Sequence, residues 1–168
     1  MSGLFSAGSY IAILPTVTTS ASTAETQGTN VWTSPTNVRT LNNLSASASV
    51  NAVTATRNMI LTLGGLSGIP SGAHIISIKI GAYWYYGDLN GLGFMNATLS
   101  TTGGATIYTL YVGNGVDAGT PTLDEWTVSG SGYTGANLSG ATVNLKISGG
   151  GEAASGFVDY IWVEVTWS

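Results

Sequence analysis

The sequence predicts an all-β protein: an antiparallel β-sandwich of jelly-roll type, with about eight strands and an extended N-terminal arm. Short runs rich in β-branched and aromatic residues alternate apolar and polar side chains, as strands buried on one face do. Glycine, proline and asparagine separate these runs. No segment repeats apolar residues at the spacing of an amphipathic helix, so helical and mixed folds are disfavoured.

The segment 157–167 is the strongest strand signal, because nearly all of its residues are β-branched or aromatic. One parity carries Phe157, Ile161, Val163, Val165 and Trp167, and the other carries Tyr160, Trp162, Glu164 and Thr166. The first set is predicted to be buried and the second half-exposed. We therefore expect a strand in the middle of a sheet, whose deletion unfolds the domain.

The segment 74–86 is the longest earlier strand signal, and the turn Ile69–Ala73 leads into it. Its predicted core face carries Ile76, Ile78, Ile80, Ala82 and Trp84. Weaker signals predict strands at 41–55, 57–63, 94–100, 105–112, 125–128 and 143–147. The segments 94–100 and 105–112 are expected to form a hairpin across the turn at 101–104. The stretches 113–124 and 130–140, on either side of the segment 125–128, are rich in glycine and are not placed by these signals.

Residues 1–30 are predicted to form an N-terminal arm and linker, and residues 31–168 the sandwich domain. The first part of the arm is apolar and the stretch 16–30 is mostly Thr, Ser and Ala, as in an extended tether. The arm residues expected to contact a capsid or a sister subunit are Leu4, Phe5, Tyr10, Ile11 and Ile13. The alternative is an N-terminal strand of the same domain, and the sequence leaves both open.

Composition excludes several classes of protein. Only 7% of the residues are charged and the net charge is −4, so the phosphates of a nucleic acid find few partners. There is no cysteine, no basic segment typical of a signal peptide and no apolar run of membrane-spanning length. The mean hydropathy of +0.27 fits either a surface buried against partners or a large core under Thr and Ser.

The residues that could carry chemistry are few. His74 is the only histidine and there is no cysteine, so a catalytic triad could use only this histidine and a zinc site lacks ligands. Asp124 and Glu125 are adjacent, and on a strand they point to opposite faces. Asp159 is expected to accept hydrogen bonds from a neighbouring loop. Calcium binding by Asp88, Asn90 or Asp117 competes with ordinary turn chemistry. We expect no catalytic residue, no metal and no cofactor.

The aromatic cluster Tyr83–Tyr86 is the clearest candidate for binding. Trp84 shares the predicted core face, whereas Tyr83 and Tyr85 lie opposite, beside the small residues Gly81 and Ser77. We name Tyr83, Tyr85 and Tyr86 as the candidate binding face. Flat aromatic rings stack on sugars and also dominate protein interfaces, so a glycan and a protein subunit both fit.

Four segments in a fixed order carry a resemblance to a known family. They are Trp32–Asn37, Ile69–Ile80, Tyr133–Val143 and Phe157–Val165. Together they resemble small jelly-roll proteins encoded among the structural genes of tailed bacteriophages, over about residues 31–168. The sequence departs from this pattern around Trp126, where relatives carry a longer Trp-containing segment.

The resemblance implies a non-enzymatic virion structural protein, a capsid decoration or cement protein that bridges subunits on the capsid exterior. Its partner would be the major capsid protein, and its assembly state a homotrimer, without contact to nucleic acid or membrane. Such a protein would be made in the host cytoplasm without a signal peptide. The alternative is a carbohydrate- or receptor-binding module of a phage fibre or tail. It would use the Tyr83/Tyr85 face or the loops 87–93 and 113–124.

Overall fold

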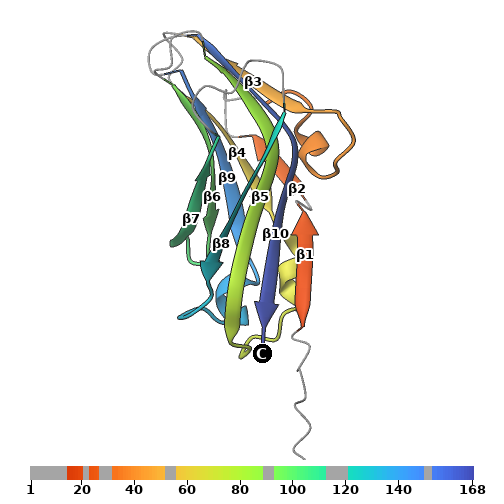
Figure 1. The fold of residues 1–168 in the computed structure, drawn as a ribbon, viewed down its shortest axis with the longest axis vertical. Helices are drawn as coiled ribbons and strands as arrows, with labels where there is room; N and C mark the ends of the chain where they lie inside the picture. Colours follow the sequence, from red (N-terminus) through yellow and green to blue (C-terminus); the bar gives the residue numbers. More distant parts are fainter. Residues whose placement is uncertain are drawn as a thin grey trace, which may run out of the picture.

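The computed structural model describes residues 15–20, 23–26, 32–51, 56–88, 93–112, 121–149 and 153–168. They form ten strands in two antiparallel five-stranded sheets that pack face to face (Figure 1). Sheet A contains, in spatial order, β1 (Thr16–Ser20), β10 (Ala154–Trp167), β5 (Ile75–Asp88) and β8 (Thr122–Ser129), with β3 (Ala46–Val50) also paired to β10. Sheet B contains, in spatial order, β2 (Thr23–Thr26), β4 (Thr56–Thr62), β9 (Thr142–Ser148), β6 (Phe94–Ser100) and β7 (Thr106–Tyr111).

The strand pairing is nested, as in a jelly roll. The innermost pair is the β6–β7 hairpin, and β5 pairs with β8 outside it. Next β4 pairs with β9, and finally β3 pairs with β10. One long hairpin wound into two sheets has this order, so the predicted fold class is confirmed. Short helices connect some of the strands: η1 (Pro35–Val38), η2 (Gly64–Gly68) and α1 (Gly135–Leu138). No helix among the described residues is long and apolar enough to span a membrane.

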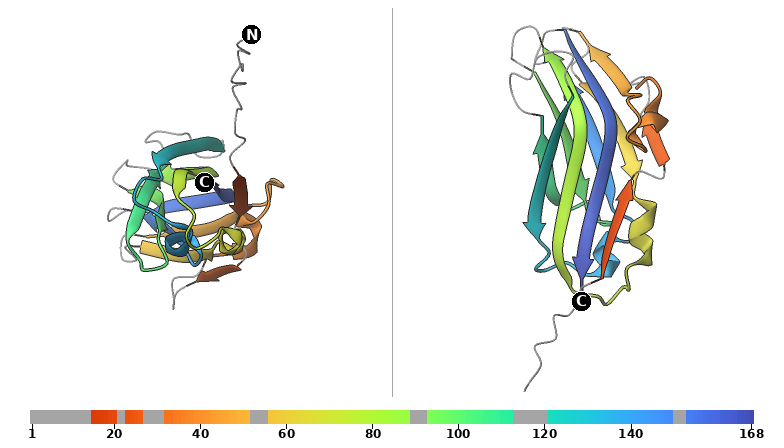
Figure 2. Two further views of the ribbon diagram at one scale, coloured as in Figure 1. Left: turned by 90° about the horizontal axis from the view of Figure 1, so that it is seen from below. Right: turned by 45° about the vertical axis from the view of Figure 1, so that its right-hand side comes forward.

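The core lies between the two sheets and is filled by alternate residues of the strands. In β10, Val158, Ile161, Val163 and Val165 are fully buried, which confirms the core role predicted for the last three. This strand pairs with β5 along nearly its whole length, and its opposite edge pairs with β3 and then β1 (Figure 2). It is therefore a central strand of sheet A, as the sequence indicated.

Two interruptions in the β5–β10 ladder change which face some residues occupy. One extra residue, Asp159, lies between the pairs formed by Val158 and Tyr160, so Phe157 points away from the core. The other interruption lies near Ile76, which is 41% exposed while Ile75 is buried. The predictions that Phe157 and Ile76 face the core are therefore wrong, because each bulge reverses the alternation on one side of it.

Part of the predicted arm and linker belongs to the sandwich. Residues 16–20 pair with β10 in sheet A, and residues 23–26 pair with β4 in sheet B. The linker interpretation is wrong for these residues, and the alternative of an N-terminal strand holds for them. The arm residues Leu4, Phe5, Tyr10, Ile11 and Ile13 lie outside the described residues.

The described residues 121–140 contain more regular structure than the predicted strand at 125–128. Strand β8 begins at Thr122, three residues before the predicted start, and pairs with β5. The short helix α1 is capped at Thr134 by a capping box: the Asn137 side chain accepts a hydrogen bond from the Thr134 backbone N–H at 2.8 Å. Neither this helix nor η1 and η2 was predicted from the strand pattern.

Candidate functional site

Five aromatic side chains lie on the outer face of sheet A, on the side away from sheet B. Tyr83 and Tyr85 come from β5, and Phe157, Tyr160 and Trp162 come from β10. The strand register places Tyr85 opposite Phe157 and Tyr83 opposite Tyr160. All five side chains are partly exposed, and we call this set the aromatic stripe.

The bulge at Asp159 assembles the stripe, because it brings Phe157 and Tyr160 to the same face although they are three residues apart. The Asp159 side chain is 2% exposed. Its carboxylate accepts hydrogen bonds from the backbone N–H groups of Asn42, at 3.3 Å, and Asn43, at 3.0 Å. The predicted bonding of Asp159 to a loop is confirmed, and the loop that follows η1 holds the bulge in place.

The rings of the stripe pack on one another and on the strand below them. The ring centroids of Tyr85 and Phe157 are 4.4 Å apart with the planes 11° from parallel, and those of Tyr160 and Trp162 are 5.4 Å apart at 14°. Trp162 crosses over Gly81, where a Cβ atom would come within 2.1 Å of the indole. Burial raises the pKa of Tyr85 above its ordinary value of 10.0, because the phenolate loses hydration under its neighbours.

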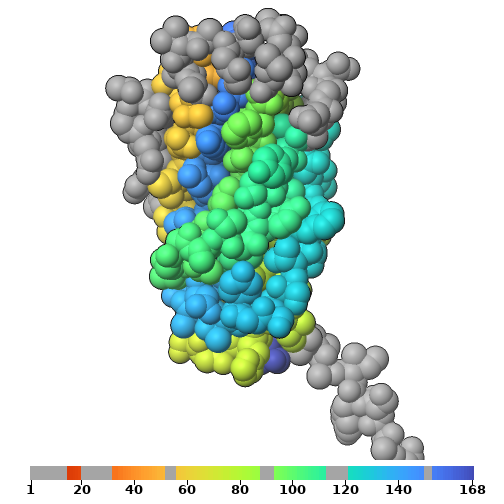
Figure 3. Space-filling model, turned by 90° about the vertical axis from the view of Figure 1, so that its left-hand side faces the viewer, coloured from red at the N-terminus to blue at the C-terminus, as the bar shows by residue number. Residues whose placement is uncertain are grey.

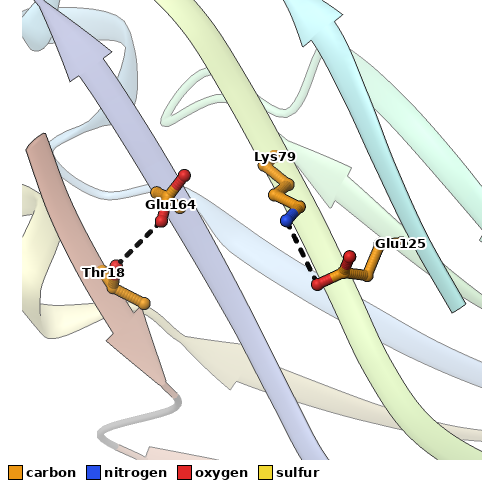
Figure 4. Close-up of polar contacts among 4 residues, drawn as sticks. All are labelled: Thr18, Lys79, Glu125 and Glu164. Carbon is orange, nitrogen blue, oxygen red and sulfur yellow. Dashed lines mark hydrogen bonds and ion pairs between the residues drawn. The ribbon is translucent and has the colours of Figure 1, made fainter. Parts of the chain in front are cut away.

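Polar side chains bound the stripe at both ends. At one end the Lys79 Nζ atom lies 3.2 Å from a carboxylate oxygen of Glu125, and the Thr18 hydroxyl donates to Glu164 at 3.4 Å (Figure 4). Lys79 and Glu164 are opposite one another in the ladder, so the charges form one row across the sheet. At the other end the hydroxyls of Ser49 and Ser155 are 3.0 Å apart.

The structure brings together two of the three predicted binding-face residues. Tyr83 and Tyr85 share the outer face, whereas Tyr86 points to the opposite face, packs against the core and donates a hydrogen bond to the Ser148 carbonyl at 2.7 Å. The inclusion of Tyr86 is wrong because successive side chains alternate across a strand. Trp84 is fully buried, as predicted, and its indole N–H donates to Asp124 at 2.6 Å.

Sequence reasoning missed the contribution of β10 to the site. Three of the five rings of the stripe, Phe157, Tyr160 and Trp162, come from this strand. They join Tyr83 and Tyr85 only because β10 pairs with β5. The alternation of Tyr160 and Trp162 was visible in the sequence and gave part of the signal. The outward position of Phe157 depends on the bulge at Asp159, so regular alternation along the strand predicts the wrong face for this residue.

Of the groups considered for catalysis, the two adjacent acids point in opposite directions. Asp124 faces Trp84 and Glu125 faces Lys79, so the two acids lie on opposite faces of β8, as predicted. His74 is exposed at the start of β5, where its backbone exchanges two hydrogen bonds of 3.0 Å with Ser168. The described residues contain no group of three or more His, Cys, Asp and Glu residues that could hold a metal. All three calcium candidates, the Asp88 side chain, Asn90 and Asp117, lie outside the described part of the chain.

Comparison with known proteins gives distant similarity of fold only. No family model matches the chain, and no curated protein matches it. The enzymatically active domain of bacteriophage CBA120 tailspike protein 4 is similar at a TM-score of 0.43 and 13% identity, over 92% of this chain and 19% of that one. TmCBM61 in complex with β-1,4-galactotriose is similar at 0.42 and 10%, over 89% and 87%. A chain of the infectious bursal disease virus Gt strain is similar at 0.36 and 15%, over 99% and 37%. These similarities are too distant to assign a function.

Proposed function

We propose that the chain is a non-enzymatic virion structural protein that decorates the outer capsid and bridges neighbouring subunits through the aromatic stripe. The observation that carries this proposal is the arrangement of the outer face of sheet A. Rings occupy its centre, and the row of Lys79, Glu125 and Glu164 bounds it on one side. An apolar centre with a polar rim is typical of protein interfaces, in which Tyr and Trp contribute much of the binding energy.

The proposed partner is the major capsid protein, and the proposed assembly is a homotrimer on the capsid exterior. The order of the four family-like segments supports this assignment, as does the apolar arm with Phe5, Tyr10 and Ile11. A bridging protein binds the assembled shell better than free subunits, so it stabilises the shell by mass action. With few charges on the chain, burying the outer face of sheet A in symmetric contacts desolvates few charged groups.

The second candidate is a carbohydrate- or receptor-binding module, favoured by the same flat rings. Trp162 and Tyr160 lie nearly parallel on the sheet, and such surfaces also bind sugar rings. The extent of the stripe argues for a protein, because it covers two strands and is continuous with the Lys79 row.

Co-sedimentation tests the proposal, using shells assembled from the major capsid protein encoded with this chain. We expect the full chain to sediment with the shells. Replacing Trp162 or Tyr85 by alanine should weaken this association by about tenfold or more, as for a central interface residue. Tyr111→Ala is the control, because Tyr111 is 60% exposed on the outer face of sheet B, away from the stripe.

A full chain that stays in the supernatant contradicts the proposal. So does a Trp162→Ala variant that binds shells as well as the Tyr111→Ala control. Sugar binding that is lost in Trp162→Ala, without any shell association, would favour the carbohydrate-binding alternative.

A further inference from the structure

A second aromatic site lies at the lateral edge of the sandwich, on the side where β7 and β8 meet (Figure 3). Among the described residues these strands end the spatial order of their sheets. Trp126 of β8 pairs with the buried Ile80, so its side chain points toward sheet B. Its ring lies nearly parallel to that of Tyr108 of β7, with planes 7° apart and centroids 5.8 Å apart.

Trp126 is both exposed and held in position. Its exposed fraction is 53%, which is unusual for the largest apolar side chain. Tyr108 supports one side of the ring and is itself packed against the hydrophobic core. The indole is therefore a flat surface that is fixed before any ligand arrives, so binding would cost little side-chain entropy.

A carboxylate lies beside this ring. Asp124 is two residues before Trp126 on the same face of β8, at a spacing of about 6 to 7 Å along a strand. One of its oxygens accepts the Trp84 indole N–H at 2.6 Å, which fixes the carboxylate in place. A carboxylate has about four lone-pair sites in all, so Asp124 keeps capacity to accept hydrogen bonds from a ligand.

Because Trp126 and Asp124 stand on alternate positions of one strand face, a pyranose ring stacked on the indole can turn its hydroxyls toward the carboxylate. The apolar C–H face of a sugar stacks on the electron-rich face of an indole, while its hydroxyls donate to the carboxylate. Asp124 and the net charge of −4 disfavour a phosphate or another anion. A protein partner needs a continuous surface of roughly 1,000 Å², whereas the neighbours of Trp126 on this face of β8 include the polar Asp124 and Thr122.

We propose that Trp126, supported by Tyr108 and assisted by Asp124, is a stacking site for a neutral pyranose of an oligosaccharide. This site lies on the opposite side of β8 from the aromatic stripe, and it does not depend on the proposed capsid role. The two sites differ in kind: the stripe spans two strands, whereas the Trp126 site offers one exposed ring beside one acceptor.

Isothermal titration of the full chain tests this site, with cellotetraose, maltotetraose and chitotetraose as probes. We expect at least one of the three to bind, and Trp126→Ala to weaken that binding by about tenfold or more. Asp124→Asn should weaken it severalfold while the fold persists, because the amide oxygen can still accept the Trp84 N–H. The control is Tyr111→Ala, because Tyr111 is exposed to a similar extent as Trp126 but lies on the other face of β7 from Tyr108. This variant should bind as the unaltered chain does.

Absence of binding for all three probes overturns the proposal. Binding that survives both Trp126→Ala and Asp124→Asn also overturns it, since the sugar then binds elsewhere. Circular dichroism of each variant separates loss of the site from loss of the fold. Shell association measured on Trp126→Ala distinguishes the two proposals, because only the capsid role predicts association there.

Discussion

At the scale of single residues, Gly81 and Trp162 define the shape of the stripe together. The indole crosses the backbone of β5 at Gly81, between Lys79 and Tyr83, where no side chain stands in its way. Any larger residue at 81 would displace the ring from the sheet. Glycine is disfavoured inside strands, so its presence in the middle of β5 is explained by this close approach.

The phenol of Tyr85 makes the free energy of unfolding decrease as the pH rises in the alkaline range. Its pKa is raised by burial, so above pH 10.0 the unfolded chain loses this proton more readily than the folded chain. The contribution is fully present below that pH and is lost as the pH rises through the folded pKa. We expect the free energy of unfolding in urea to fall between about pH 9 and about pH 11 by less in Tyr85→Phe than in the unaltered chain.

Tyr83→Phe, which removes a hydroxyl two residues away on the same face, controls for the loss of a tyrosine. An equal fall in the unaltered chain and in Tyr85→Phe would show that burial of Tyr85 has no part in the effect.

At the scale of elements, the bulge in β10 connects stability to the site. Asp159 is buried and accepts two backbone N–H groups, whereas Glu125 has a side chain that is 35% exposed and pairs with Lys79. Losing the first removes two hydrogen bonds from backbone N–H groups to a buried carboxylate, while losing the second removes a solvated ion pair.

We therefore expect Asp159→Ala to lower the free energy of unfolding by about 1 to 3 kcal/mol. Glu125→Ala, the control, should change it by about 1 kcal/mol or less. Urea denaturation measures both. If the two variants are equally stable, the loop after η1 does not hold the bulge.

At the scale of the whole molecule, β10 lies inside sheet A, with β5 paired to one edge and β3 and β1 paired to the other. Strand β1 continues the edge that β3 begins, so residues 16–20 belong to the sandwich. A test of the arm must therefore remove residues 1–14 only, and leave β1 in place.

Light scattering on a sizing column measures the mass of the full chain and of a chain that starts at Pro15. We expect a trimer for the full chain and a monomer for the shortened one, with cooperative unfolding in both because β1 is intact. Removal through Ser20 should lower the melting temperature by several degrees, since it exposes the edge of β10 from Trp162 to Thr166. A monomeric full chain contradicts the trimer, and a trimer in both places the contacts on the sandwich faces.

The sequence by itself determined the fold class, the central place of β10, the hairpin of β6 and β7, and the opposite directions of Asp124 and Glu125. These follow from alternation within one strand and from turn residues, which are local properties. Alternation also identified Tyr83 and Tyr85 as outward-facing, and Trp84 as core.

Only the tertiary structure decided which strands lie side by side, and therefore which rings meet. Phe157 faces outward because a loop 116 and 117 residues earlier in the chain holds a bulge at Asp159, and no local pattern contains that contact. Trp126 and Tyr108 meet because two sheets end at the same edge. A single strand fixes the alternation of its side chains, whereas pairing across the chain fixes register and neighbours, so both aromatic surfaces emerge only on folding.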